Sequence, residues 1–281
     1  MTSRPLLPLV ALLLAACGGP QPEVCFEDQE PSPSPAQPRG EAGLLPYAHA
    51  HNDYEHPRPL EDALAARFYS VEADVYFASG RFEVSHFGWG SKGTLEALYL
   101  APLQERVNAQ GSVHGDGIPF TLWIDLKDSD SRLVEQLEAL FARFDMLQPG
   151  VGEGSIAPVR IALTGHAAMK ESFADATSLA AVTRDSNTFS LEDPVATDER
   201  WRAYALNWGK YLSWNGVGEM PADQRRRLNC LVENAHAKGR VLRLFATPDR
   251  EEVWKASLEA GVDFIHTDHL EALSAFLRDQ P

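Results

Sequence analysis

The chain has few basic residues and few cysteines for its length. Lys and Arg together number 25 against 40 Asp and Glu in 281 residues, which gives a formal net charge of -15. This acidity argues against sequence-independent binding to nucleic acid and against electrostatic attraction to an anionic membrane. An anionic substrate would therefore have to bind through a local cation.

An apolar run long enough to cross a membrane as a helix is also missing. The run from Leu6 to Ala16 is of signal-peptide length and follows Arg4. It ends just before Cys17, and this arrangement resembles a bacterial lipoprotein signal that is cleaved at residue 16 and lipidated on Cys17. We therefore expect a membrane-anchored lipoprotein of the bacterial cell envelope, on its periplasmic or surface side. An ordinary secretory signal is the alternative.

Residues 17–43 are expected to form a Pro-rich flexible tether, because Pro31–Pro38 reads PSPSPAQP and carries little apolar surface. With Cys17 lipidated, the remaining cysteines are Cys25 in this tether and Cys230 in an expected helix. These two could pair in an oxidising compartment, but the flexible tether disfavours a disulfide, and the sequence does not decide the pairing. Residues 44–281 show no internal repeat and no second domain.

From Leu44 onward, strand-like and helix-like segments alternate, which is typical of βα units. The expected strands are Leu45–His49, Val71–Phe77, Phe82–Ser85, Phe120–Leu126, Val159–Thr164, Thr188–Leu191, Tyr211–Trp214, Arg240–Phe245 and Phe264–Thr267. The expected helices are Pro59–Arg67, Leu95–Ala109, Arg132–Phe144, Ala168–Ser178, Asp198–Asn207, Ala222–Lys238, Arg250–Ala260 and His269–Arg278. Polar residues follow many of the strands, so we predict an α/β fold of the TIM (β/α)₈ barrel type with one extra hairpin strand.

The hairpin Ser70–His86 carries the strongest candidate site. Strand alternation places Glu72 and Asp74 on the same face, where two carboxylates repel each other unless a cation lies between them. A divalent cation is the usual solution, and the return strand brings His86 close by. The hairpin therefore predicts a metal-assisted acid–base site.

Two further strands end in chemically active residues. His49 and His51 share a face of the first strand and could serve as general base, as metal ligand, or as backbone-bonded loop residues. Asp125 and Lys127 follow an apolar run, where Asp125 could be a third carboxylate on the cation and Lys127 could neutralise a phosphoryl oxygen. A plain surface ion pair is the alternative for this pair.

Three other positions at strand ends are also candidates. His166 could contact substrate or cap the next helix, Trp214 could form a wall of the pocket or belong to the core, and Asp268 could line the barrel mouth or cap the last helix.

Taken together, these motifs resemble the PI-PLC-like phosphodiesterase superfamily. The segment HxHNDYEHPRPLEDAL from His49, then SVEADV, His86 and WIDLK, is most similar to the branch named for altered inheritance of mitochondria. Glycerophosphodiester phosphodiesterases and sphingomyelinase D are related enzymes. The similarity continues through SWNG, RLFATPD and HTDHL.

The resemblance implies a metal-dependent phosphodiesterase, a phosphoric diester hydrolase, on a TIM barrel. It assigns His51 and His86 as catalytic histidines, with His51 favoured as base and His86 as acid, and Lys127 as the lysine beside the phosphate. The implied metal ligands are Glu72, Asp74 and Asp125, and the cation is Mg²⁺ or Ca²⁺. Candidate substrate-binding residues are His49, Asn52, His166 and Trp214.

The expected substrate is a small-molecule or lipid phosphodiester, cleaved by a monomer that binds no nucleic acid. Glycerophosphodiesterases have Arg-Gly where this chain has Asn52-Asp53, and many members have Asp at the position of Phe87. These departures leave the substrate open. The alternatives are a zinc amidohydrolase-type enzyme using His49, His51, His166 and Asp268, and a catalytically inactive surface-binding lipoprotein.

Overall fold

The computed structural model describes residues 45–129, 133–149, 156–196 and 200–280. The predicted signal peptide, the lipidation site at Cys17 and the tether to residue 43 lie outside this part of the chain. Among the described residues, none of the helices combines the length and the hydrophobicity that crossing a lipid bilayer requires.

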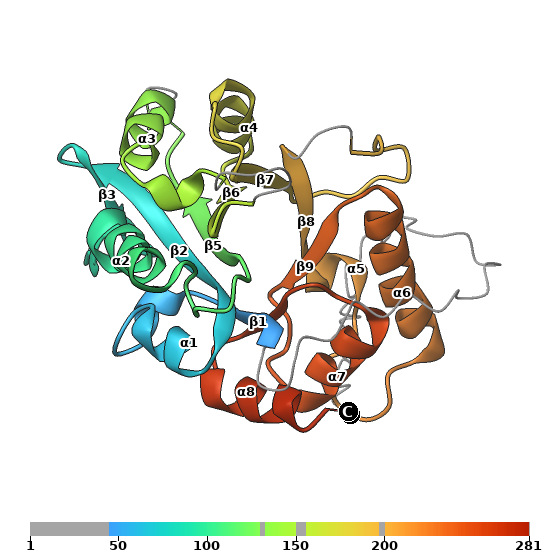
Figure 1. Cartoon of the computed structure of the whole chain (residues 1–281). Helices are drawn as coiled ribbons and strands as arrows, with labels where there is room; N and C mark the ends of the chain where they lie inside the picture. The colour runs from blue at the N-terminus through green and yellow to red at the C-terminus, as the bar shows by residue number, and fades with distance from the viewer. Residues whose placement is uncertain (1–44, 130–132, 150–155, 197–199, 281) are drawn as a thin grey trace, which may run out of the picture.

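The fold is mixed α/β and is built on a ten-stranded, mostly parallel sheet (Figure 1). The strands are β1 Leu45–Ala50, β2 Phe68–Ala78, β3 Arg81–Val84, β4 Gly93–Thr94, β5 Phe120–Leu126, β6 Val159–Gly165, β7 Val182–Ser186, β8 Trp201–Asn207, β9 Val241–Phe245 and β10 Ile265–Thr267. The parallel strands follow the order β10-β1-β2-β5-β6-β7-β8-β9, and β3 and β4 extend β2 as an antiparallel hairpin. A single parallel bridge between Arg243 of β9 and Phe264 joins the two ends of this order.

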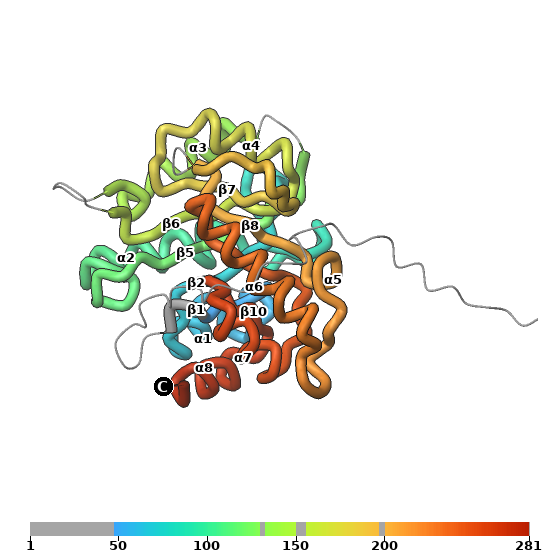
Figure 2. Tube along the Cα trace, turned by 90° about the vertical axis from the view of Figure 1, so that its right-hand side faces the viewer, coloured from blue at the N-terminus to red at the C-terminus, as the bar shows by residue number. Residues whose placement is uncertain are grey.

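The helices lie outside the curved sheet, as Figures 1 and 2 show. They are α1 Glu61–Ala65, α2 Ala101–Gln110, α3 Leu133–Phe141, α4 Ala167–Ala176, α5 Trp208–Tyr211, α6 Ala222–Ala237, α7 Glu251–Ala260 and α8 Leu270–Arg278. A π-helical turn, Glu96–Leu100, leads into α2, and short 3₁₀ turns occupy Asp53–Glu55 and Asp145–Leu147.

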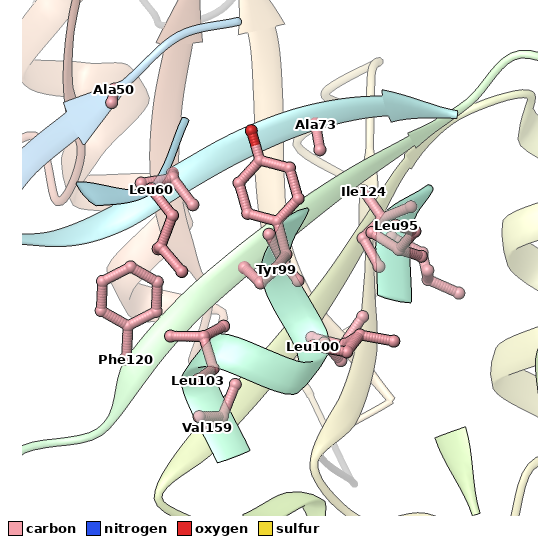
Figure 3. Close-up of a cluster of buried hydrophobic side chains, with 14 of the residues drawn as sticks. Ala50, Leu60, Ala73, Leu95, Tyr99, Leu100, Leu103, Phe120, Ile124 and Val159 are labelled. Carbon is pink, nitrogen blue, oxygen red and sulfur yellow. The ribbon is translucent and has the colours of Figure 1, made fainter. Parts of the chain in front are cut away.

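The main hydrophobic core lies between the outer face of the sheet and these helices (Figure 3). Alternation along β5 sends Leu122 and Ile124 into this core. Trp123 points to the opposite face and forms a separate cluster with the small side chains of Ala162, Ala203 and Ala205. The inner face of the sheet therefore has room for a tryptophan and, beyond it, for polar residues.

Most predicted elements are confirmed, but those of the β7–β8 region are wrong. Thr188–Leu191 and Tyr211–Trp214 were expected as strands and Asp198–Asn207 as a helix. The structure instead has strand β7 before Thr188, strand β8 within the expected helix, and helix α5 ending at Tyr211. Ala and Leu in the sequence of β8 favour a helix in isolation. Hydrogen bonding to β7 and β9 on both sides overrides that preference.

Cys230 of α6 is disulfide-bonded, whereas the sequence disfavoured a disulfide without deciding the pairing. Its partner lies outside the described residues.

His236 and Asp263 connect the end of α6 to the segment that leads into β10. His236 Nε2 lies 2.8 Å from Asp263 Oδ2, and the same oxygen accepts a hydrogen bond of 2.8 Å from the Leu242 backbone N–H. The hydrogen bond to Asp263 raises the pKa of His236 above its ordinary value of 6.5.

We predict that His236→Asn changes the pH dependence of stability. Because the pKa is raised in the folded state, the stabilisation is full below pH 6.5 and is lost as the pH rises through the folded-state pKa. Urea unfolding from pH 5.5 to 8.5 should show the variant less stable by about 0.5–1 kcal/mol at low pH, with the difference closing at high pH. His269→Asn, at an exposed histidine, is the control, and parallel curves for wild type and His236→Asn would contradict the prediction.

Candidate active site

Three carboxylates meet where β2 and β5 lie side by side. Glu72 and Asp74 are two residues apart on β2 and so share a face, and Asp74 is directly opposite Asp125 in the parallel register of β2 and β5. One oxygen from each of Glu72, Asp74 and Asp125 lies within 4.8 Å of the others. We call this group the carboxylate cluster.

Two basic side chains offset the charge of this cluster. Arg243 Nη2 is 2.6 Å from Glu72 Oε2, and Lys127 Nζ is 2.6 Å from Asp125 Oδ2 and 2.9 Å from Asp74 Oδ2. Burial by itself would raise the pKa of Glu72, but the adjacent Arg243 guanidinium holds that pKa well below its usual range. Glu72 is therefore an anion although it is only 4% exposed.

Asp125 is the member of the cluster whose hydrogen bonding is incomplete. Its Oδ1 atom is buried and has no hydrogen-bond partner. Burial, with the neighbouring Asp74 and Glu72, raises the pKa of Asp125 to about 6, although Lys127 opposes this shift. An unpartnered oxygen beside two other carboxylates is the kind of position that a bound cation satisfies, so this residue set fits a divalent metal ion.

Gly165, at the end of β6, keeps the space around Asp125 open. Its φ is +86°, and a Cβ there would collide with Asp125 Oδ1 and come within 2.5 Å of the Leu126 carbonyl oxygen. Only glycine satisfies both the backbone angle and the close approach.

His86 lies directly against the carboxylate cluster. Its Nδ1 is 2.8 Å from Asp74 Oδ2, and the Tyr54 hydroxyl lies 3.4 Å from the same nitrogen. The Tyr54 hydroxyl donates to Asn52 Oδ1 at 3.0 Å, and burial together with Asp74 raises the pKa of Tyr54, so this hydroxyl remains protonated. Asp74 and Tyr54 thus fix the orientation of the His86 ring.

His51 lies at the end of β1, on the other side of Glu72. Because Ala50 pairs with Val71, the next residue, His51, comes level with Glu72 of the neighbouring strand. His51 Nδ1 is 2.8 Å from Asp268 Oδ1. Each of the two histidines is therefore held by a separate carboxylate.

The predicted substrate-binding residues occupy different kinds of position. His49 is fully buried behind Glu72, where its Nδ1 bonds Ser70 Oγ at 2.8 Å. Burial and Arg243 lower the pKa of His49 to about 3, so this ring is neutral. Asn52 lies beside His51 with a left-handed φ of 43° and bonds Tyr54.

His166 and Trp214 make contacts of another kind. His166 is exposed at the start of α4, and its backbone N–H donates to the Leu126 carbonyl. Trp214 belongs to the hydrophobic cluster around α6 and donates from Nε1 to the Val217 carbonyl at 3.2 Å. The contacts of His166 are those of a residue at the start of a helix, and the contacts of Trp214 are those of a core residue.

Two sets of buried charged side chains were not identified from the sequence, Arg243 and the ion pair of Lys170 with Asp185. Arg243, which holds Glu72, is a lone charge in the apolar strand sequence VLRLF, and that isolation was the available signal. Lys170 of α4 forms a buried ion pair with Asp185 of β7 and bonds Asn187 Oδ1 at 2.6 Å. This second pair adds to a polar layer that extends across the inside of the sheet.

The comparisons with known proteins follow the predicted resemblance. Residues 42–116 match the family described as the AIM6-like phosphodiesterase domain. Three relatives carry the name altered inheritance of mitochondria protein 6. The protein of Eremothecium gossypii is 27% identical over 83% of this chain and 70% of its own length. The protein of Lachancea thermotolerans is 25% identical over 82% and 65%, and that of Kluyveromyces lactis 23% over 83% and 72%.

The predicted similarity to the altered-inheritance-of-mitochondria branch of the PI-PLC-like superfamily is therefore confirmed. The matched segment begins before β1 and contains His51, Glu72, Asp74 and His86 of the site. The family is one of phosphodiesterases by its description.

The predicted localisation is contradicted by the same comparisons. The chain was expected to be a membrane-anchored lipoprotein of a bacterial cell envelope, whereas the three relatives are proteins of eukaryotic yeasts. The similarity of Leu6–Cys17 to a bacterial lipoprotein signal was short and compositional, and this made it a weak basis for the assignment.

We predict that Gly165→Ala destabilises the fold and displaces Asp125. The new methyl group must avoid both Asp125 Oδ1 and the Leu126 backbone, in addition to the cost of a positive φ for alanine, which is about 1 kcal/mol. Gly80→Ala is the matched control, because Gly80 has a φ of +77° and open space at its Cβ position. Thermal unfolding should show a larger loss for Gly165→Ala than for Gly80→Ala, and equal losses would remove the close packing on Asp125 from the account.

Proposed function

We propose that this protein is a metal-dependent phosphodiesterase that cleaves a phosphodiester bond of glycerophosphodiester or phospholipid type, with two histidines as general acid and base. The phosphodiesterase class rests on the family match. The observation that carries the finer proposal is the convergence of Glu72, Asp74 and Asp125 with a carboxylate-held histidine on either side.

The proposal includes closure of the parallel strands into a (β/α)₈ barrel. In its support, the eight parallel strands begin with β10 and end with β9, and the bridge from Arg243 to Phe264 joins these two. The site residues lie at or near the carboxyl ends of the strands, which is where enzymes with this barrel place their active sites.

The carboxylate cluster would hold the divalent cation, Mg²⁺ or Ca²⁺, through Glu72, Asp74 and Asp125. Oxygen ligands of this kind are those that hard cations prefer, and such an ion supplies positive charge for the phosphoryl oxygens as the transition state develops. Lys127 is partly exposed and lies between Asp74 and Asp125, so its ammonium group can donate a hydrogen bond to a phosphoryl oxygen.

His51 and His86 would carry the proton transfers. In each ring Nδ1 is engaged by a carboxylate, Asp268 for His51 and Asp74 for His86, so Nε2 is the nitrogen left to face the reacting groups. His51 would take the proton from the attacking hydroxyl, and His86 would give a proton to the leaving oxygen. The attacking group is either a hydroxyl of the substrate, which yields a cyclic phosphate, or water.

Two exposed aromatic rings beside His86 favour a substrate with an apolar portion. Phe87 packs edge-on against His86 with ring centroids 4.4 Å apart, and Trp89 stacks on Phe87 at 5.4 Å. Their exposed fractions are 59% and 75%, which is high for such large apolar side chains. A lipid-type diester would cover this surface when its leaving group reaches His86. We propose that the protein acts on such a diester as a monomer and binds no nucleic acid.

The zinc amidohydrolase alternative has less support. His166 is exposed at the start of α4, and fully buried His49 bonds Ser70. The reaction would also leave the carboxylate cluster without a role. The inactive-protein alternative is decided by assay.

We predict that His51→Ala and His86→Ala each lower phosphodiesterase turnover by at least about 10²-fold while circular dichroism and melting temperature stay close to wild type. The assay is a panel of glycerophosphodiesters, lysophospholipids, inositol lipids and a chromogenic diester with added Mg²⁺ or Ca²⁺. EDTA should abolish the activity and either cation restore it. His269→Ala, at an exposed histidine, is the control.

Near-wild-type turnover in either variant would remove that histidine from the mechanism. Activity that persists in EDTA would show that the reaction does not require a divalent cation. Complete inactivity of the wild type across the panel would favour the non-enzymatic alternative.

A further inference from the structure

A second group of metal-type ligands lies where β1 and β10 meet, beside the carboxylate cluster. His51, His266 and Asp268 each offer one ligand atom, and these atoms lie within 4.8 Å of one another. The parallel pairing of His49 with His266 and of Ala50 with Thr267 brings the ends of the two strands together. The rings of His51 and His266 have centroids 4.1 Å apart.

One ring nitrogen of His266 has no hydrogen-bond partner among the described residues. His266 is 5% exposed, and its Nδ1 is buried without a hydrogen-bond partner. A buried polar atom without a partner is costly, and native structures avoid it unless a ligand or water satisfies the atom. Burial, together with the neighbouring charges of His51 and Arg243, keeps the pKa of His266 low, so a lone pair is available at neutral pH.

The chemistry of this second group differs from that of the carboxylate cluster. Two imidazoles and one carboxylate suit borderline ions such as Zn²⁺, whereas three carboxylates suit Mg²⁺ and Ca²⁺. Asp268 has an exposed side chain, so an ion can enter from solvent and keep water on its open side. His51 Nδ1 lies 2.8 Å from Asp268 Oδ1, within hydrogen-bond distance, and a metal ion bound between them would take the place of the hydrogen-bonded proton.

We propose that His51, His266 and Asp268 form a second cation site, selective for zinc-type ions over Mg²⁺ and Ca²⁺. An ion bound there draws electron density from the His51 ring and breaks its hydrogen bond to Asp268. The ion therefore inhibits the enzyme by removing the base, a consequence that rests on the proposed function. The binding itself does not depend on that function.

The test is titration of the full-length chain with Co²⁺, a spectroscopic probe for zinc sites, in excess Mg²⁺ so that the carboxylate cluster is saturated. We expect visible absorption of four-coordinate Co²⁺ that saturates at one ion per chain and is displaced by Zn²⁺. His266→Asn and Asp268→Asn should each weaken Co²⁺ and Zn²⁺ binding at least about 10-fold. The carboxylate-cluster variant Asp125→Asn should retain this site, and His269→Asn, next to Asp268, is the matched control.

Wild-type Co²⁺ affinity in Asp268→Asn would overturn the proposal, and so would loss of the signal in Asp125→Asn. Because the Asp268 side chain is exposed, this variant decides the question even if His266→Asn fails to fold. Where phosphodiesterase activity is present, Zn²⁺ should inhibit it over the concentration range in which it displaces Co²⁺. If the activity is absent, the absorption titration still confirms or rejects the site.

Discussion

Asp74 and Asp125 lie opposite each other on β2 and β5, and Glu72 adds a third negative charge on the same face of the sheet. Two buried carboxylates and a partly buried one would repel one another without the two cations that reach them, Arg243 and Lys127. Arg243 comes from β9, so its ion pair with Glu72 connects two residues that are 171 positions apart in the sequence. Removing one partner of such a buried pair typically costs about 3–5 kcal/mol. The inner face of the sheet is therefore organised by the need to offset negative charge.

The arrangement around this cluster separates residues that support the site from residues that are free to react. Glu72 is held from behind by Arg243 and lies beside neutral His49, and neither of these two side chains is exposed. His51 and His86 are partly exposed and keep one ring nitrogen outside their carboxylate hydrogen bonds. Asp125, whose Oδ1 atom has no hydrogen-bond partner, is contacted through its other oxygen by Lys127. Burial thus strengthens the ion pair between Glu72 and Arg243, and partial exposure lets a substrate reach the two histidines.

The sequence predicted the parts of the fold that depend on local pattern. The alternation in SVEADV placed Glu72 and Asp74 on one face, and the apolar strand Phe120–Leu126, which contains Asp125 and precedes Lys127, was predicted with its bounds correct. It failed at β8, where Ala and Leu indicate a helix and only pairing with β7 and β9 makes a strand. Contacts between strands that are distant in the sequence could not be predicted either. The pairing of Arg243 with Glu72 and of Asp268 with His51 depends on strand order, which local pattern does not specify. The segment Leu6–Cys17 led to a wrong localisation because its similarity to a lipoprotein signal rested on composition alone.

The measurement that tests the central claim most directly is the stability of the metal-free chain as Mg²⁺ or Ca²⁺ is added. If Glu72, Asp74 and Asp125 hold one cation in the folded state alone, the free energy of unfolding should rise by about 2.7 kcal/mol when the ion reaches 100 times its dissociation constant. Asp125→Asn should lose most of that rise, whereas Asp223→Asn, at an exposed carboxylate on α6, should keep it. An unfolding free energy that does not respond to either cation, or that responds equally in Asp125→Asn, would contradict the account.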